Sequence, residues 1–463
     1  MILKLFRFHF FTVILCLEMF FGSGFLGAQT AVVPDVKVSL DLVLTEYPFN
    51  FQFGYAVPSM AQSLSFTKSV DALVFYPQEG FLDRIMINSD PIRKNTLKFS
   101  YFFALEIFMF YLPLGDAWLH ESFHQSVMKI HGIESYNEVY EFQFFSPSIS
   151  VSHVKDEDLA ALKAKSNPDF VRLHAAGNEA NILLATELGE TGFFRQEPWV
   201  VSRQTIIFMN LLNSSLYVQM CTTPAAEEKT KEMNQSEGSD IPSRDFTGLD
   251  FTAWTYDLFR PDEPYSARGL HPYGGQGIAR YISPSQLTGE EKAYLSQQAS
   301  LSFLNFIDTS FIPLDLSVAG TDGVKIRTAG NLRYHMTSFG NSIQANLYLK
   351  REELNLAVSY HNYTNKNNYF PGIEIKIVDY SLEMAGMDFK FTPRVLGWLQ
   401  PKNQSFTTGD FELGYLLDLK AAWGVTDYSS LWIKGTKKSP GWVAGNEYLS
   451  EHFSLSAGLS LEF

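Results

Sequence analysis

The sequence has little cysteine and a deficit of positive charge. Cys16 and Cys221 are the only cysteines in 463 residues. Two thiols cannot build the disulfide framework on which small secreted domains depend. Lys and Arg total 36 against 50 Asp and Glu, which gives a net charge of −14. Because an acidic surface repels phosphate backbones, we do not expect a nucleic-acid partner.

Long apolar runs are also scarce. Beyond the N-terminus, no segment offers the roughly 20 uninterrupted apolar residues that a membrane-spanning helix requires. The nearest candidate, Phe99–Leu114, is interrupted by Glu106 and Pro113. This argues against a multi-pass helical membrane protein. Hydrophobic residues nevertheless make up 46% of the chain, which is enough for a folded core and excludes wholesale disorder.

The N-terminus has the order of charges and apolar residues found in secretory signal peptides. Lys4 and Arg7 precede an apolar stretch over 8–21, and small residues follow up to Ala28. We therefore predict a signal peptide over residues 1–28 and an exported protein. The alternative is an uncleaved anchor helix.

The early mature chain alternates between apolar and polar residues. Val36–Thr45 and Phe49–Tyr55 both follow a period of two. This period is typical of strands with one buried face. The sequence therefore predicts a β-rich segment over residues 29–96.

A helical domain is predicted over residues 97–310. Its apolar runs over 101–131, 170–188 and 199–220 are too long for ordinary strands. Asn167 and Pro168 form a start signal for the second of these helices. Shorter helical segments are expected over 249–259 and 285–306. The polar stretch 224–244 is predicted to be a mobile surface loop.

The chain after residue 324 is strand-like and resembles a bacterial outer-membrane β-barrel. Several segments alternate with period two, and 411–423 is the longest. In the segment 453–463, alternate residues from Phe453 to Phe463 are apolar while those between them are small or polar. A strand with one apolar and one polar face suits a barrel wall in lipid. The segment resembles the closing strand of outer-membrane barrels, and 324–463 has room for roughly eight strands.

A short motif in the helical domain carries the strongest chemical signal. His120-Glu121-Ser122-Phe123-His124 places two imidazoles at positions i and i+4, on one face of a helix. Two such imidazoles can bind one zinc ion, with Glu121 beside them as a general base. A catalytic zinc site needs a third protein ligand and keeps one position open.

The third ligand is suggested by a family resemblance. Asn178-Glu179-Ala180, together with the His-Glu-x-x-His motif, resembles the zinc-binding segments of thermolysin-like peptidases, the gluzincins. The resemblance implies that His120, His124 and Glu179 bind Zn²⁺ and that Glu121 is catalytic. His174 is an alternative third ligand, and Asp116 is a candidate to orient an imidazole.

Two structural interpretations compete with these assignments. His120, His124 and Glu121 are also compatible with ordinary residues at the edge of a core. A second polar cluster flanks the Pro/Gly-rich loop 261–277, where loop salt bridges are favoured over a binding cleft. Its members are Asp250, Asp257, Arg260, Arg268, His271 and Arg280.

The sequence as a whole predicts an α+β protein, with a helical zincin-like domain followed by an antiparallel β-barrel or barrel-like sheet. The expected function is zinc-dependent hydrolysis of peptides in the outer membrane of a double-membraned bacterium. Its expected partners are outer-membrane lipid and a peptide or protein substrate. One alternative is a non-enzymatic barrel protein, such as an adhesin, small channel or assembly factor. Another is a soluble periplasmic protein with a β-sandwich.

Overall fold

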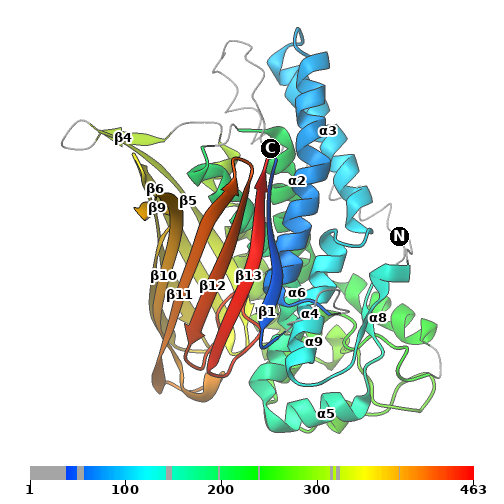
Figure 1. The fold of residues 1–463 in the computed structure, drawn as a ribbon. Coiled ribbons are helices and arrows are strands. Elements are labelled where there is room, and N and C mark those ends of the chain that lie inside the picture. The colour runs from blue at the N-terminus through cyan, green and yellow to red at the C-terminus, as the bar shows by residue number, and fades with distance from the viewer. Residues whose placement is uncertain are drawn as a thin grey trace.

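The computed structural model describes most of the chain after the predicted signal peptide. The described residues are 38–49, 57–141, 149–196, 199–237, 240–312, 316–319, 324–384 and 386–463. The predicted signal peptide and most of the predicted strand over 49–55 lie outside these residues. The architecture is α+β, with helices in the first part of the chain and a large antiparallel sheet in the second (Figure 1).

The sheet contains eleven strands within the described residues. Its order is β1-β13-β12-β11-β10-β8-β7-β6-β5-β4, and β9 pairs with β10 off this path. The sheet is strongly curved but is not closed by hydrogen bonds among the described residues (Figure 1). Its strands are β1 (Ser39–Tyr47), β4 (Ser317–Ala319), β5 (Lys325–Thr337), β6 (Gly340–Arg351), β7 (Leu354–Thr364), β8 (Tyr369–Ile377), β9 (Tyr380–Met384), β10 (Met387–Pro401), β11 (Phe411–Thr426), β12 (Ser429–Lys438) and β13 (His452–Glu462).

Helices pack against the concave side of the sheet and against both of its ends. Helix α2 packs on β1, whereas α6 and α10 pack on β5. A separate two-stranded sheet, formed by β2 (Tyr136–Asn137) and β3 (Val151–Ser152), belongs to the helical part. The helices among the described residues are α2 (Met60–Ile85), α3 (Pro91–Phe110), α4 (Asp116–Ile130), α5 (Asp156–Lys165), α6 (Asn167–Phe194), α7 (Val201–Met220), α8 (Pro224–Ser236), α9 (Asp250–Phe259) and α10 (Gly289–Ser302).

Helix α6 is the central element of the helical part, and its sequence explains why. The Ser166 side chain caps its first turn, and Pro168 lies where a helix tolerates proline. Small residues over 175–180 allow neighbouring helices to approach closely. Helices α4, α7 and α9 all pack on α6. The side chain of Arg333 on β5 donates a hydrogen bond of 2.9 Å to Thr186, which ties α6 to the sheet.

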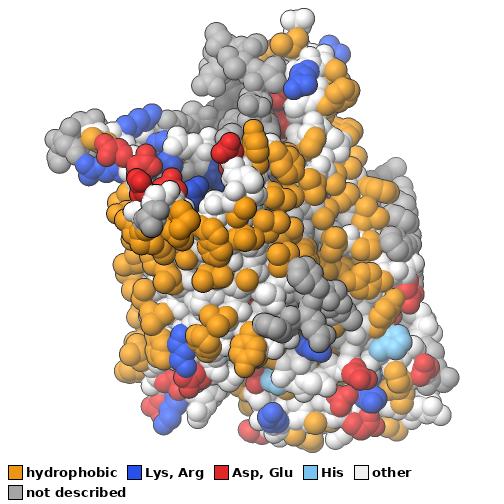
Figure 2. Space-filling model, in the orientation of Figure 1, with side chains coloured by type: hydrophobic (Ala, Val, Ile, Leu, Met, Phe, Trp, Pro, Cys, Tyr) orange, Lys and Arg blue, Asp and Glu red, His pale blue; other side chains and the backbone are white. Residues whose placement is uncertain are grey.

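The two faces of the sheet differ in polarity. A cavity of about 550 Å³ on the inner side is lined by charged side chains from the strands and from α2 and α6. The ion pairs Lys420–Asp41 and Lys376–Glu190 lie there. The outer face carries a broad area of hydrophobic side chains, with charged groups above and below it (Figure 2). Exposed members on the strands include Leu347, Ile373, Val395, Leu413, Leu419, Ile433 and Leu455.

Several sequence predictions are confirmed. Helix α6 begins at Asn167, as its start signal predicts, and α9 and α10 fall within the predicted segments. After residue 324 the described chain is almost entirely antiparallel strand, with β13 covering the segment that resembles a closing barrel strand. Nine strands, β5–β13, follow residue 324, close to the predicted eight. The sheet also recruits β1 and β4 from outside that range.

Two predictions about local structure are wrong. Among its described residues, the segment 29–96 is not mainly β, because β1 is the only strand there and α2 occupies Met60–Ile85. A capping box between Ser59 and Gln62 starts this helix. The segment 224–244 is not simply a loop, since helix α8 covers Pro224–Ser236. Pro224 in its first turn and buried Met233 explain why a polar sequence forms a docked helix there. None of the described helices combines the length and hydropathy needed to cross a membrane.

Candidate metal centre

His120 and His124 lie on one face of α4, as their spacing predicts. Their ring centroids are 5.0 Å apart. Both Nε2 atoms face the carboxylate of Asp250, the first residue of α9. The distances to Asp250 Oδ2 are 3.2 Å from His120 and 3.4 Å from His124. Two nitrogens and one carboxylate oxygen therefore converge from two helices that are distant in sequence.

The spacing of these three atoms fits a small divalent cation. Zinc binds nitrogen and oxygen at about 2.0–2.1 Å in a tetrahedron, whose edges are then about 3.3 Å long. The observed separations of 3.2 and 3.4 Å match such an edge. His124 and Asp250 are buried, while 14% of the His120 side chain is accessible. All three atoms lie within 4.8 Å of one another, so small rotations of these side chains would let them hold a zinc ion with three protein ligands.

The Nδ1 atoms of both imidazoles have their own hydrogen-bond partners. His120 Nδ1 lies 3.2 Å from Asn181 Oδ1, and His124 Nδ1 lies 2.6 Å from the carbonyl oxygen of Leu173. Because these oxygens accept, each Nδ1 donates to its partner, and each Nε2 is left facing Asp250. Such partners commonly fix the orientation and tautomer of metal-binding histidines.

The hydrogen bond to His120 continues into the core. Asn181 donates to Asn210 Oδ1 at 2.8 Å, and Asn210 donates to Asp116 Oδ2 at 2.8 Å. Asp116 therefore acts on His120 through two asparagines. Its predicted part in orienting an imidazole takes this indirect form.

Gly177 brings the backbone of α6 close to the candidate ligands. A Cβ atom there would lie 2.3 Å from His120 Nε2 and 2.4 Å from His124 Nε2. Both distances are far below van der Waals contact. The absence of a side chain at this position therefore keeps open the space beside the two nitrogens.

Glu179 has a different environment from the one expected of a third ligand. Its Oε1 accepts hydrogen bonds from Gly445 N at 2.7 Å and from Arg172 Nη2 at 3.1 Å. Two residues along a helix correspond to a rotation of about 200°. Glu179 therefore points away from the imidazoles when Gly177 faces them. The group of candidate metal ligands among the described residues is His120, His124 and Asp250.

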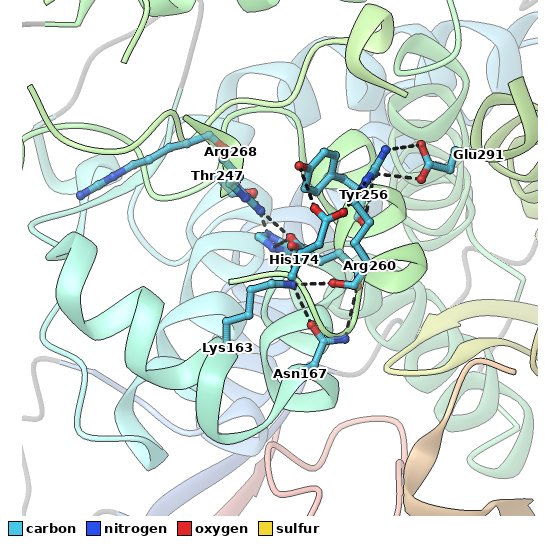
Figure 3. A network of polar contacts seen from close by, with 11 residues as sticks. Lys163, Asn167, His174, Thr247, Tyr256, Arg260, Arg268 and Glu291 are labelled. Carbon is cyan, nitrogen blue, oxygen red and sulfur yellow. Dashed lines mark hydrogen bonds and ion pairs between the residues drawn. The ribbon is translucent and has the colours of Figure 1, made fainter. Parts of the chain in front are cut away.

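His174, the alternative third ligand, belongs to a separate polar network (Figure 3). Its Nε2 lies 3.1 Å from Asp257 Oδ2, and its Nδ1 lies 2.7 Å from Thr247 Oγ1. Lys163 donates to the other oxygen of Asp257 at 2.8 Å, and Arg268 also pairs with this carboxylate. Both nitrogens of His174 are thus used to hold α9 against α6.

The other charged residues around the Pro/Gly-rich loop form salt bridges, as the favoured interpretation predicts. Arg260 pairs with Glu291 (Figure 3), and Arg280 pairs with Asp156. His271 lies 3.1 Å from Glu237. Asp250 is the exception, because it leaves this group and joins the imidazoles.

The charges around the centre set the protonation of its carboxylates. Burial opposes ionisation of Asp250, but His124 and His120 hold its pKa well below the usual range. Burial raises the pKa of Glu121 well above its usual value, and the negative charges of Asp250 and Asp245 add to this effect. Glu121 is therefore ionised more readily when positive charge offsets Asp250.

Tyr217 positions the first residue of α9, which is the third candidate ligand. Its hydroxyl accepts a hydrogen bond of 3.1 Å from Asp250 N, and its ring lies 6.0 Å from that of His120. Sequence reasoning did not single out this residue. Asp250 is also difficult to assign from sequence, because no spacing rule links it to a motif 130 positions away.

Comparisons with known proteins do not add a family. The chain matches no family model, no curated protein and no solved structure. The candidate site therefore depends on its own geometry.

Proposed function

We propose that the protein is a zinc-dependent peptidase of the bacterial outer membrane. The observation that carries the enzymatic part is the convergence of His120 Nε2, His124 Nε2 and Asp250 Oδ2 within 4.8 Å of one another. The choice of a peptide substrate comes from the resemblance of the His-Glu-x-x-His motif to zinc peptidases. Asp250 replaces Glu179 as the third ligand in this proposal.

The chemistry follows from the position of Glu121. Zinc at such a site acts as a Lewis acid toward water and a carbonyl group. Glu121 follows His120 directly on α4 and is buried. Its carboxylate takes a proton from the attacking water and later delivers it to the leaving amine. Asp250 and the two imidazoles would hold the ion, while Asn181 and Leu173 fix the imidazoles.

The polarity of the sheet supports a membrane location. Charged side chains line the cavity on its inner side, beside a buried apolar cluster that includes Trp398 and Trp442, whereas the outer face is apolar across many strands (Figure 2). A soluble sandwich has the opposite arrangement, with an apolar interior. On β11, exposed apolar residues extend from Phe411 to Leu419, a length of about 26 Å at 3.3 Å per residue. At the strand tilt of about 40° found in outer-membrane barrels, this length covers about 20 Å of an apolar band that is about 25 Å tall.

Metal analysis of the purified full chain tests the enzymatic proposal. We expect about one zinc per chain in the natural protein and little in the His120→Ala and Asp250→Ala variants. Glu121→Gln is expected to keep zinc and to lose cleavage of labelled casein. Glu138→Gln is the matched control and should keep both properties, because the Glu138 carboxylate accepts from Ser150 and is no candidate ligand.

Zinc content, cleavage and detergent extraction together separate the alternatives. A folded protein without stoichiometric zinc would refute the peptidase proposal and favour a non-enzymatic barrel protein. Zinc binding without hydrolysis in any assay would refute the peptidase proposal and favour a metal-binding envelope protein. Extraction of the protein from cell envelopes without detergent would refute the membrane part and favour the soluble periplasmic alternative.

A further inference from the structure

The α2–α3 hairpin has charged side chains inside and apolar side chains outside. Five of its ionisable residues are almost completely buried, each at most 4% exposed: Asp71, Glu79, Asp83, Lys98 and Glu106. A helix pair on the surface of a water-soluble protein normally shows the reverse distribution. In the sequence, Glu106 stands out only as an interruption of the apolar run Phe99–Leu114.

Three of these residues, Glu79, Asp83 and Lys98, are held by specific partners. Lys98 Nζ lies 2.9 Å from Asp83 Oδ1 and also pairs with Glu79. Lys94 adds a second contact to Asp83 at 2.8 Å. Glu79 accepts a hydrogen bond of 2.8 Å from Ser202 N at the start of α7. The charges thus join α2 to α3 and to the rest of the helical part.

The outward face of the hairpin is apolar. Leu73, Pro77 and Phe81 are exposed at intervals of four residues on α2, and Leu97 and Tyr101 continue the pattern on α3. Such intervals place side chains on one face of a helix. Over residues 69–83 and 95–110, every exposed side chain is uncharged.

Exposed charges on the hairpin are confined to its tip. Arg84, Asp90 and Arg93 are the exposed ionisable residues of the stretch that joins the two helices. The tip lies beyond the end of β13 (Figure 1). An apolar outer wall with charges at the end of the hairpin and in its interior is the distribution that a hydrocarbon surrounding favours.

The apolar surface of the hairpin is continuous with that of the sheet. Helix α2 packs directly on β1, which pairs with β13. Hydrophobic side chains cover the outer faces of β13 and the neighbouring strands and continue over the hairpin (Figure 2). Whatever covers the outer face of the sheet therefore also borders the outer face of the hairpin.

We propose that the α2–α3 hairpin faces the hydrocarbon of the same bilayer as the sheet and completes the wall beside β1, where the strands stop. This inference rests on the proposed membrane location of the sheet. The hairpin contacts lipid on one side only, and its other side carries the ion pairs with the protein. The wall in lipid is thus built from strands and helices together.

Spin labels on single cysteines test the proposal in the full chain. Cys16 and Cys221 are first replaced by Ala, and the protein is placed in vesicles of phosphatidylethanolamine and phosphatidylglycerol. Labels are attached at Leu73→Cys, Phe81→Cys and Leu97→Cys. Leu419→Cys on β11 reports the sheet, and Leu270→Cys in the Pro/Gly-rich loop is the water-exposed control. Accessibility to oxygen, which enters lipid, is compared with accessibility to a polar nickel chelate.

The expected result is that Leu73→Cys and Leu97→Cys match Leu419→Cys, with an oxygen-to-nickel ratio severalfold above that of Leu270→Cys. If Leu419→Cys reports lipid and the hairpin labels report water, the hairpin proposal is overturned while the membrane location stands. Protection of the hairpin labels from both reagents would also overturn it, because another protein surface would then cover them. Water at all positions would refute both proposals together.

Discussion

His124 Nδ1 lies 2.6 Å from the carbonyl oxygen of Leu173, in the second turn of α6. This bond has a counterpart in the contact between His120 and Asn181 on the same helix. Helix α6 therefore supplies an acceptor to each imidazole from opposite sides of Gly177. The orientation of the candidate ligands on α4 depends on the register between the two helices.

Replacing Asn181 by Leu should weaken zinc binding by about 10–100-fold, the usual cost of losing such a partner. The imidazole of His120 then loses the acceptor that fixes its tautomer. Competition with a chelator of known affinity measures the change. Asn178→Leu, a buried substitution on the same helix, is the control for general disturbance of α6. Equal losses in both variants would contradict the specific role of Asn181.

Gly177→Ala should abolish stoichiometric zinc binding. The added methyl group would lie 2.3 Å from His120 Nε2, so that an imidazole or the helix must move. Gly189→Ala is a matched control on α6, because nothing lies within 4 Å of its Cβ position. The control should bind zinc normally and gain up to about 1 kcal/mol of stability from better helix propensity. Full zinc content in Gly177→Ala would disprove the proposed arrangement.

Asp257→Asn should lower the free energy of unfolding by about 3–5 kcal/mol at pH 7, because it leaves Lys163 and Arg268 buried without their shared carboxylate. Burial opposes ionisation here, but Arg268, His174 and Lys163 hold the pKa of Asp257 below its usual 3.8. The contribution of this carboxylate is therefore complete above pH 3.8 and is lost as the pH falls through the lower pKa of the folded protein.

Denaturant unfolding of the zinc-free protein in detergent, at several pH values, measures this effect. The difference between the natural chain and Asp257→Asn should be constant near neutral pH and should shrink below pH 3.8. A difference that grows with acidity would show that the network in Figure 3 is not held by an ionised Asp257.

Leu419→Arg should destabilise the protein in vesicles by about 2–4 kcal/mol if this outward position on β11 faces the middle of a bilayer. Leu270→Arg is the control, since Leu270 is 71% exposed in a loop of the helical part. Urea titration of the protein in vesicles measures both variants. Little effect at either position would indicate that the outer face of the sheet meets water.

Much of the fold follows from periodicity. The strands after residue 324 and helix α6 were predictable, because one face of each is apolar over many residues. Helix α2 was missed for a physical reason. Its buried face carries Asp71, Glu79 and Asp83, whereas its exposed face carries Leu73 and Phe81, so its pattern does not match that of a soluble amphipathic helix.

The candidate site was partly predictable for a similar reason. His120 and His124 come from one helix, where sequence spacing fixes spatial spacing. Asp250 comes from another helix, and its proximity depends on how α4, α6 and α9 pack together. Local similarity favoured Glu179, but the rotation of α6 turns that residue toward Arg172 and the loop before β13.

Strand β1 has a consequence for how the molecule assembles. Ser39 on β1 pairs with Glu462 on β13, so that every α-helix of the described residues lies in the chain between β1 and the strands that follow residue 324. The helical part is thus one long insertion between two segments of the chain that belong to the same sheet. Contacts between residues so distant in sequence form slowly. Once formed, they reduce the conformational entropy of the chain segment between them. We therefore expect that detaching β1 loosens the packing of α4, α6 and α9, although none of them touches the severed hydrogen bonds.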